Sequence, residues 1–484
     1  MRLLIPATFL INERTPSCNL IQQLRAPSIT REGHLINYSG NRISGHLFQP
    51  SESALQQILI LPPKTKTLPD AHAIILGFAI DPSSPNIDAS KGVWLKGQVA
   101  ALSGSASTSR QRIQQILASW KDAFHYVQED SASGVTGLRA PQIGALHAIH
   151  AHWSTSEKTA TIVMPTGTGK TDTMIAILVS ARCNRLLVVV PTDALRTQIA
   201  DKFLTLGILG LSGNSLLRES TLYPVVCRLE HIPKTTAEID DLLDLAQVII
   251  TTSSIAGQCS PEVQERLAFH CSHLFIDEAH HAEAPTWRSF KERFAEKRTV
   301  QFTATPFRED GQPLDGDIIY RYPLKKAQQE GYFQPIHFES VLEFDPTRSD
   351  QTIALKAVAR LREDFDKGHI VMARVESVVR AKEVFQLYRM YPEFNPVEIH
   401  TGIKSQKARN EARESILSGK SRIVVCVDML GEGFDLPELK IAAFHDIRKS
   451  LSVTLQLAGR FTRARANLGN ATFIANVANP NVRE

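Results

Sequence analysis

The sequence has few features that would place the chain outside ordinary globular proteins. Its 484 residues include only six cysteines and no C-x-x-C pair, so we expect a reducing compartment rather than a disulfide framework. It has no run of about 18 apolar residues, and we therefore predict no membrane span. The 54 basic and 50 acidic side chains give a formal net charge of only +4, which does not by itself indicate nucleic acid. These absences favour a cytoplasmic protein.

Two series of short apolar runs divide the sequence. The first series is 161–164, 186–190, 248–251, 273–276 and 300–303, and the second is 370–373, 397–400, 423–427, 441–444 and 472–477. Uninterrupted apolar runs that alternate with helical patterns are typical of strands buried on both faces of a parallel sheet. The sequence therefore predicts an α/β protein with two similar lobes.

The predicted organisation has five regions. They are an N-terminal accessory domain, mainly β, at 1–110; a helix and linker at 111–137; a first lobe at 138–310; an inter-lobe segment at 311–335; and a second lobe at 336–484. Apolar residues recur at helical spacing from Ile113 to Val127, which predicts one amphipathic helix. We expect the accessory domain to bind nucleic acid or a protein partner, with a degenerate nuclease as the alternative.

A glycine-rich segment follows the apolar run 161–164 and precedes a helical pattern. It reads Pro-Thr-Gly-Thr-Gly-Lys-Thr over residues 165–171. A tight turn between a strand and a helix aims backbone N–H groups at one point, which suits a polyphosphate. We expect Lys170 to reach the β- and γ-phosphates of ATP and Thr171 to bind Mg²⁺. The other nucleotide-binding residues expected in this loop are Thr166, Gly167, Thr168 and Gly169.

Two adjacent carboxylates follow the apolar run 273–276, in the sequence Asp277-Glu278-Ala279-His280. An acidic residue at the carboxyl end of a buried parallel strand faces the crevice in which α/β proteins bind ligands. We expect Asp277 to hold Mg²⁺ and Glu278 to act as the base for the water that attacks the γ-phosphate.

These motifs resemble those of the superfamily 2 helicases and translocases, in the DEAH-box branch that includes type I and type III restriction-enzyme motors. Further segments carry the resemblance, at 138–142 (Leu-Arg-Ala-Pro-Gln) and 456–463 (Gln-Leu-Ala-Gly-Arg-Phe-Thr-Arg), and it covers residues 138–480. The resemblance implies two tandem RecA-like lobes with parallel sheets, plus an N-terminal α+β accessory domain. It also implies ATP hydrolysis with Mg²⁺ in the cleft between the lobes.

In the first lobe, the resemblance also implies contacts with the adenine base and with nucleic acid. Gln142 is similar to the glutamine that recognises adenine, and an ordinary helix-start residue is the alternative. Hydroxyls at strand ends suit the phosphate oxygens of a nucleic-acid backbone, and helix capping is the alternative. The residues expected to contact nucleic acid, or to couple it to hydrolysis, are Pro191, Thr192, Thr251, Thr252, His280, Thr303 and Thr305.

In the second lobe, the resemblance implies further nucleotide contacts. Gly433 and Asp435 lie in the segment Gly-Glu-Gly-Phe-Asp, which is similar to a ribose-contacting motif; a simple turn is the alternative. Gln456 begins the arginine motif. Arg460 and Arg463 are three residues apart, so on a helix they would project from one face. The resemblance implies that both arginines act as arginine fingers on the γ-phosphate.

The motifs and the resemblance together predict an ATP-dependent nucleic-acid motor, and the resemblance to restriction-type and repair-type motors favours DNA over RNA. Two motor activities stay open, strand separation by a helicase and translocation along double-stranded DNA. The alternative from another class is an ATP-dependent regulatory switch, or a subunit of a restriction, repair or defence complex that does not itself unwind.

Overall fold

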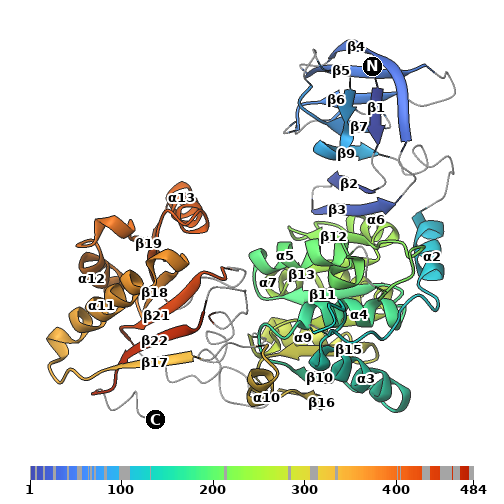
Figure 1. The fold of residues 1–484 in the computed structure, drawn as a ribbon. Helices are drawn as coiled ribbons and strands as arrows, with labels where there is room; N and C mark the ends of the chain where they lie inside the picture. Colours follow the sequence, from blue (N-terminus) through green and yellow to red (C-terminus); the bar gives the residue numbers. More distant parts are fainter. Residues whose placement is uncertain are drawn as a thin grey trace. The chain divides into compact units, whose positions relative to one another are not determined.

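A computed structural model gives the fold of the chain (Figure 1). The residues that it describes are 2–5, 8–14, 17–25, 29–40, 43–51, 57–63, 65, 68–69, 72, 74–80, 84, 86–97, 109–130, 132–211, 215–281, 285–305, 314–332, 336–400, 402–403, 405–427, 436–446, 461 and 469–478.

The described chain forms two compact units. The first consists of Met1–Thr161, Thr171–Gln301 and Asp315–Ile319, and the second consists of Ile162–Lys170, Phe302–Leu314 and Tyr320–Glu484. Among the described helices, none is both long enough and apolar enough to cross a lipid bilayer.

The N-terminal part of the chain is built from strands. They are β1 (Arg2–Ile5), β2 (Thr8–Arg14), β3 (Cys18–Arg25), β4 (Ile29–Gly40), β5 (Ile43–Pro50), β6 (Ile58–Leu61), β7 (Ile74–Gly77), β8 (Asn86–Asp88) and β9 (Val93–Gly97), with a 3-10 turn, η1 (Ala89–Lys91). Their sheet is mixed: β4 and β5 pair antiparallel, whereas β6 and β7 pair parallel. A buried cluster that includes Phe48, Ile60 and Trp94 forms its core.

The first α/β region follows. Its strands are β10 (Ala160–Val163), β11 (Leu186–Val190), β12 (Val225–Leu229), β13 (Val248–Thr252), β14 (His273–Ile276), β15 (Arg298–Thr303) and β16 (Asp317–Arg321). Its helices are α2 (Ser109–Ser119), α3 (Ala140–Thr155), α4 (Lys170–Ser180), α5 (Asp193–Leu204), α6 (Thr236–Leu245), α7 (Ser253–Gln258), α8 (Pro261–His270), α9 (Pro285–Glu292) and α10 (Leu324–Gln329), with 3-10 turns η2 (Gly207–Gly210) and η3 (Ala279–His281).

These strands lie in the order β16-β10-β15-β14-β11-β13-β12. The pairs β11–β13, β11–β14, β12–β13 and β14–β15 are parallel. Every residue of β11, β13 and β14 is buried, which explains why their sequences are continuous apolar runs. The strands predicted at 186–190, 248–251 and 273–276 are therefore confirmed.

The predicted helix from Ile113 to Val127 is shorter than its spacing indicates. α2 ends at Ser119, and Asp122 has a φ of 53°, in the left-handed region that a continuing helix cannot use. Trp120 lies beyond the helix, where its Nε1 donates to the carbonyl of Leu222 at 2.8 Å. This tertiary contact places the apolar residues after Ser119 in a turn and an extended segment.

Strand β3 extends the sheet of the α/β region. It pairs antiparallel with β12, with residues Cys18 to Gln22 opposite Leu229 to Val225. The sheet then continues from β3 in the order β2-β9-β7-β6-β5-β4-β1-β8. The predicted boundary near residue 110 stays a prediction, but β3 itself covers the edge of β12.

The second α/β region has a sheet of its own. Its strands are β17 (Ile336–Val341), β18 (Ile370–Val375), β19 (Val397–Ile399), β20 (Ile423–Val427), β21 (Leu439–Phe444) and β22 (Ala471–Asn476), in the order β17-β22-β21-β18-β20-β19. Each strand pair described in this sheet is parallel. Its helices and 3-10 turns are α11 (Pro346–Glu363), α12 (Val378–Tyr388), α13 (Gln406–Leu417), η4 (Phe365–Lys367) and η5 (Pro392–Phe394).

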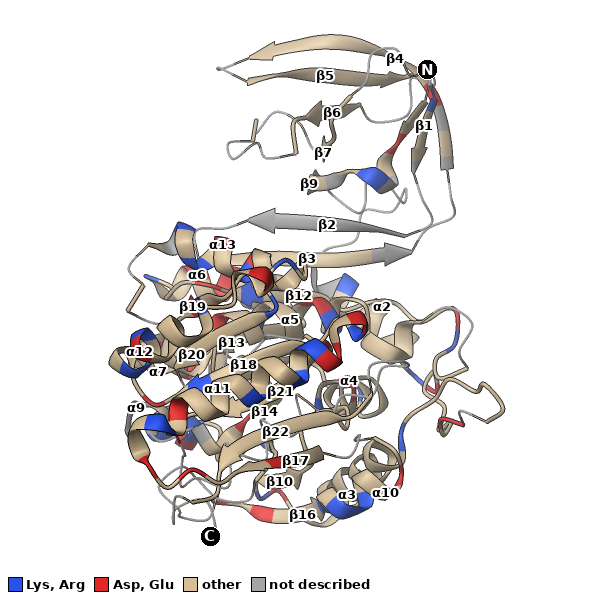
Figure 2. Ribbon diagram, turned by 60° about the vertical axis from the view of Figure 1, so that its left-hand side comes forward, with Lys and Arg blue, Asp and Glu red and all other residues tan. Residues whose placement is uncertain are grey.

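Two apolar clusters cover this second sheet. One includes Val358 of α11, Val384 of α12 and Val371 of β18, since both helices pack on the sheet. The other contains Ala442 of β21 and Phe461. Together with the parallel strands, these clusters confirm the predicted α/β class. Charges of both signs lie along the described helices, α11 among them, as expected from the small net charge (Figure 2).

Candidate functional site

The glycine-rich loop joins the end of β10 to the first residue of α4. Gly167 and Gly169 have φ values of 93° and 96°, in the left-handed region that favours glycine. The Thr168 hydroxyl donates to the carbonyl of Pro165 at 2.7 Å, which closes the loop on itself. The predicted phosphate loop therefore has a turn that a side chain at either glycine would strain.

Lys170 is the first residue of α4, and Thr171 is the second. The N–H groups of a helix's first turn have no partner within the helix, and they favour an anion. Lys170 is 8% exposed, and the Thr166 Oγ1 atom is buried with no hydrogen-bond partner among the described residues. A loop with a cation, a helix N-terminus and a spare hydroxyl fits the phosphates of a nucleotide.

Asp277 and Glu278 follow the buried strand β14. The Asp277 N–H donates to the carbonyl of Val189 at 2.9 Å, so the end of β14 is tied to β11. Asp277 is 7% exposed. The Glu278 Oε2 atom lies 3.5 Å from Nδ1 of His280, which is itself buried. The structure thus brings together the predicted base and the predicted coupling histidine.

Glu278 has a φ of 47°, which is uncommon for a residue with a side chain. Asp122, Arg182, Leu206 and Asn395 have the same left-handed backbone, so this conformation does not by itself identify a functional turn.

Thr303 and Thr305 form a closed polar turn after β15. The Thr303 hydroxyl donates to the carbonyl of Thr305 at 2.7 Å and accepts the Thr305 N–H at 3.2 Å. The Thr303 carbonyl also accepts the N–H of Met164 at 2.9 Å, directly before the glycine-rich loop. Both threonines are buried. The bond between Met164 and Thr303 links the turn to the glycine-rich loop through main-chain atoms.

Three predicted contact residues have structural roles that the sequence left open as alternatives. The Gln142 Oε1 atom accepts the Arg139 N–H at 2.7 Å, at the start of α3. Thr192 caps α5 by accepting the N–H of Leu195, and Thr252 caps α7 in the same way. Contacts of these side chains with adenine or nucleic acid stay predictions.

Two more predicted contact residues lie at strand ends. Pro191 directly follows β11, and Thr251 is buried in β13 with its hydroxyl 3.5 Å from the carbonyl of Leu229. The predicted nucleotide residues of the second lobe, Gly433, Asp435, Gln456, Arg460 and Arg463, lie outside the described residues.

Sequence reasoning missed two buried cations of the second sheet. Arg374 lies inside β18, and Lys440 lies inside β21; each is 1% exposed. Burial lowers the pKa of Lys440 despite the nearby Glu438. A charged residue within an otherwise apolar run is the signal that would have identified both.

Comparison with known protein families gives two matches along the chain. Residues 136–308 match the family described as type III restriction enzyme, res subunit, and residues 353–465 match the helicase conserved C-terminal domain. The two domains support a superfamily 2 helicase, and together they confirm the two predicted RecA-like lobes.

Similar proteins match over shorter stretches. A 51.5 kDa protein of a Lactococcus phage (isolate 7-9) is 23% identical over 222 residues, or 43% of this chain and 49% of that protein. The pre-mRNA-splicing ATP-dependent RNA helicase PRP28 of Debaryomyces hansenii is 28% identical over 27% of this chain and 22% of its own length. DEAD-box ATP-dependent RNA helicase 15 of Arabidopsis thaliana is 31% identical over 23% of this chain and 26% of its own length. The chain thus spans half or less of each of these relatives.

Proposed function

We propose that this helicase is a DEAH-box motor of the restriction-enzyme branch, which uses ATP and Mg²⁺ to translocate along DNA or separate its strands. The observation that carries the proposal is the glycine-rich loop at the start of α4, in a chain that also has the acidic Asp277–His280 turn after β14.

In this proposal, the loop binds the phosphates of ATP. The N–H groups of residues 166–169 and the Lys170 ammonium neutralise the phosphate oxygens. Thr171 and Asp277 would hold Mg²⁺, which supplies further positive charge at the phosphates. The buried Thr166 hydroxyl offers one more hydrogen bond.

Glu278 accepts a proton from the attacking water in the proposed hydrolysis step, and His280 orients its carboxylate. Arg460 and Arg463 act as arginine fingers on the γ-phosphate. The remaining proposed nucleotide contacts are Gln142 with adenine, Gly433 and Asp435 with ribose, and Gln456 in the arginine motif.

The proposed nucleic-acid path follows the strand ends of the first lobe. Pro191, Thr192, Thr251 and Thr252 would contact the phosphate backbone, which carries no sequence information. The buried Thr303–Thr305 turn, bonded to Met164, would couple this contact to hydrolysis. The restriction-enzyme description of the first domain supports DNA and partners in a restriction complex. The proposal also includes partners in a repair or defence complex and a cytoplasmic location.

ATPase assays with single-stranded DNA, duplex DNA and RNA, side by side, test the proposal. We expect DNA to stimulate hydrolysis more than RNA does. Stimulation by RNA alone would overturn the DNA assignment and agree with the relatives named as RNA helicases. Equal rates with and without nucleic acid would refute both motor activities and favour an ATP-dependent switch.

Two substitutions test the ATP site itself. Lys170→Ala and Glu278→Gln should each lower kcat/KM for ATP by at least about 100-fold. Glu278→Gln should keep nucleotide affinity, because it preserves the size of the side chain. Wild-type turnover in Glu278→Gln would contradict the assignment of the base.

A third assay separates the two motor activities. A helicase displaces a labelled strand from a DNA duplex. A duplex translocase leaves the duplex intact and instead displaces a triplex-forming oligonucleotide.

A further inference from the structure

The second sheet contains a buried lysine that donates a hydrogen bond to the main chain. Lys440 lies in β21, and its Nζ donates to the main-chain carbonyl of Phe461 at 2.9 Å. Ala442 and Phe444 share its face of the strand, since side chains alternate along β21. Lys440 therefore extends over an apolar face to the main-chain oxygen of Phe461.

Phe461 is fixed by its side chain as well as by its carbonyl. It is helical and fully buried. Its ring packs edge-on against the ring of Phe473, 5.4 Å between centroids, and Phe473 also contacts Phe444 of β21. Phe461 directly follows Arg460 and precedes Arg463 by two residues, so Lys440 acts on the main chain between the two predicted arginine fingers.

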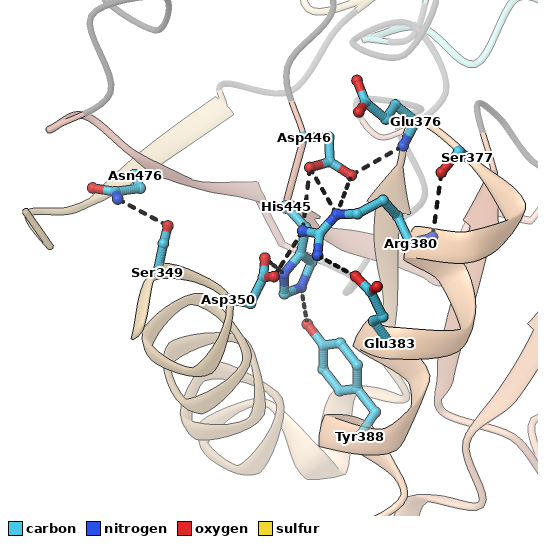
Figure 3. A network of polar contacts seen from close by, with 10 residues as sticks. All are labelled: Ser349, Asp350, Glu376, Ser377, Arg380, Glu383, Tyr388, His445, Asp446 and Asn476. Atoms are coloured by element: carbon cyan, nitrogen blue, oxygen red, sulfur yellow. Dashed lines mark hydrogen bonds and ion pairs between the residues drawn. The ribbon is translucent and has the colours of Figure 1, made fainter. Parts of the chain in front are cut away.

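The chain is also held where it leaves β21. Asp446 accepts hydrogen bonds from the Arg380 guanidinium at 3.2–3.3 Å and from the Glu376 N–H at 3.1 Å (Figure 3). Arg374 donates to the main-chain carbonyl of Asp446. These contacts join the carboxyl ends of β18 and β21 at Asp446, directly before residue 447.

The residue before Asp446 belongs to the same polar network. The His445 Nδ1 atom lies 2.9 Å from Asp350 Oδ1, and its Nε2 lies 3.0 Å from the Tyr388 hydroxyl (Figure 3). Arg380 donates to Asp350 at 2.7 Å. α11 and α12 thus both contribute to fixing residues 445 and 446.

We propose that Lys440 is a positioning residue for hydrolysis, which holds the main chain between Arg460 and Arg463 while the Arg380–Asp446 pair holds the chain before residue 447. The inference rests on the proposed function, because it takes these arginines as the fingers. A hydrogen bond from an ammonium to a main-chain carbonyl fixes the position of that carbonyl more strictly than apolar packing does, since the bond is directional and charge-assisted. An arginine finger acts only where the γ-phosphate lies, so a shift of about 1 Å is enough to slow the reaction about 100-fold.

Steady-state ATPase kinetics of Lys440→Met test this inference. Methionine fills a similar volume but cannot donate to the Phe461 carbonyl. We expect kcat to fall about 10- to 100-fold with KM for ATP changing less than about threefold, because the phosphate loop is untouched. Lys440→Arg keeps a cationic donor and should recover kcat to within about threefold of the wild type.

Arg422→Met is the matched control. Arg422 lies in the same region and also donates to main-chain carbonyls, at 2.6 Å to His369 and 3.3 Å to Phe365. Neither bond involves the arginine motif, so the loss of Arg422 should leave kcat unchanged. Equal losses of kcat in Arg422→Met and Lys440→Met would overturn the inference, because general weakening of the fold would then account for both.

A mutant cycle with the double substitution Arg460→Ala and Arg463→Ala decides whether Lys440 acts through the arginines. If it does, Lys440→Met lowers kcat no further in the background that lacks both arginines. Independent, multiplying effects would overturn the inference. If Lys440→Met does not fold, Phe461→Leu loosens the same anchor while keeping the carbonyl, and wild-type kcat in it would also overturn the inference.

Failure of this inference is distinguishable from failure of the proposed function. A normal rate in Lys440→Met with an inactive Lys170→Ala would refute the positioning role alone. A normal rate in Lys170→Ala would refute the ATP site on which both depend.

Discussion

The pairing of β3 with β12 predicts that the N-terminal strand stabilises the first helicase lobe. Leu20 and Ile21 of β3 point to opposite faces of the sheet and are 5% and 9% exposed, as in an interior strand. Polar side chains add to the junction: Asn19 donates to Glu230 at 3.1 Å, and Gln22 donates to the carbonyl of Tyr223 at 3.4 Å. β3 therefore shares both its core and its hydrogen bonds with β12.

Leu20→Ala is the perturbation that measures this dependence. Removing a buried leucine side chain costs about 2–5 kcal/mol. If β12 opens together with β3, a loss of about 2 kcal/mol accelerates amide exchange in β12 about 30-fold. Hydrogen-exchange mass spectrometry of peptides covering 225–229 gives this rate directly.

Leu59→Ala provides the matched control. Leu59 is a fully buried leucine of β6, in an apolar cluster distant from β12 in strand order. It should destabilise the N-terminal sheet by a similar amount and leave exchange at 225–229 unchanged. Unchanged exchange in Leu20→Ala as well would refute the shared sheet and favour a separate N-terminal domain.

Three further predictions follow from single residues. Burial lowers the pKa of His273 to about 4, so the folded state resists protonation of this side chain. The free energy of unfolding should therefore fall by up to about 3 kcal/mol from pH 6.5 to pH 4. Urea unfolding measures this fall, and His273→Leu should remove it. Gly169→Ala introduces a side chain at a φ of 96° and should weaken binding of a fluorescent ATP analogue by at least about tenfold, whereas unchanged affinity would contradict the phosphate loop. Thr192→Ala removes the cap of α5 and should lower the unfolding free energy by about 1 kcal/mol. If this variant also loses DNA affinity about tenfold while Thr192→Ser does not, Thr192 contacts nucleic acid as well as capping the helix.

Strands such as β11 and β20 could be predicted because each is an uninterrupted apolar run, which is typical of strands buried on both faces of a sheet. The glycine-rich loop could be predicted because its two left-handed residues must be glycine. Both features depend on local sequence.

Other features depend on residues distant in the sequence and could not be predicted. The pairing of Leu20 with Cys227 depends on which edge of the sheet is left uncovered, which no local pattern reveals. The helical spacing predicts a helix that extends beyond Ser119, where α2 ends. The contact of Trp120 with Leu222 stabilises a turn there instead, and helical spacing does not reveal this contact. The Phe461 anchor also required the fold, since Lys440 precedes it by 21 residues.

The bond from the Met164 N–H to the Thr303 carbonyl has a consequence for mutagenesis. The bond involves only backbone atoms, so a displacement of the peptide at Thr303 also displaces Met164, the residue before Pro165. Replacing side chains one by one leaves this connection intact, and alanine scanning would not detect it. Met164→Pro, which lacks the donor, or an amide-to-ester replacement at residue 164 would break it.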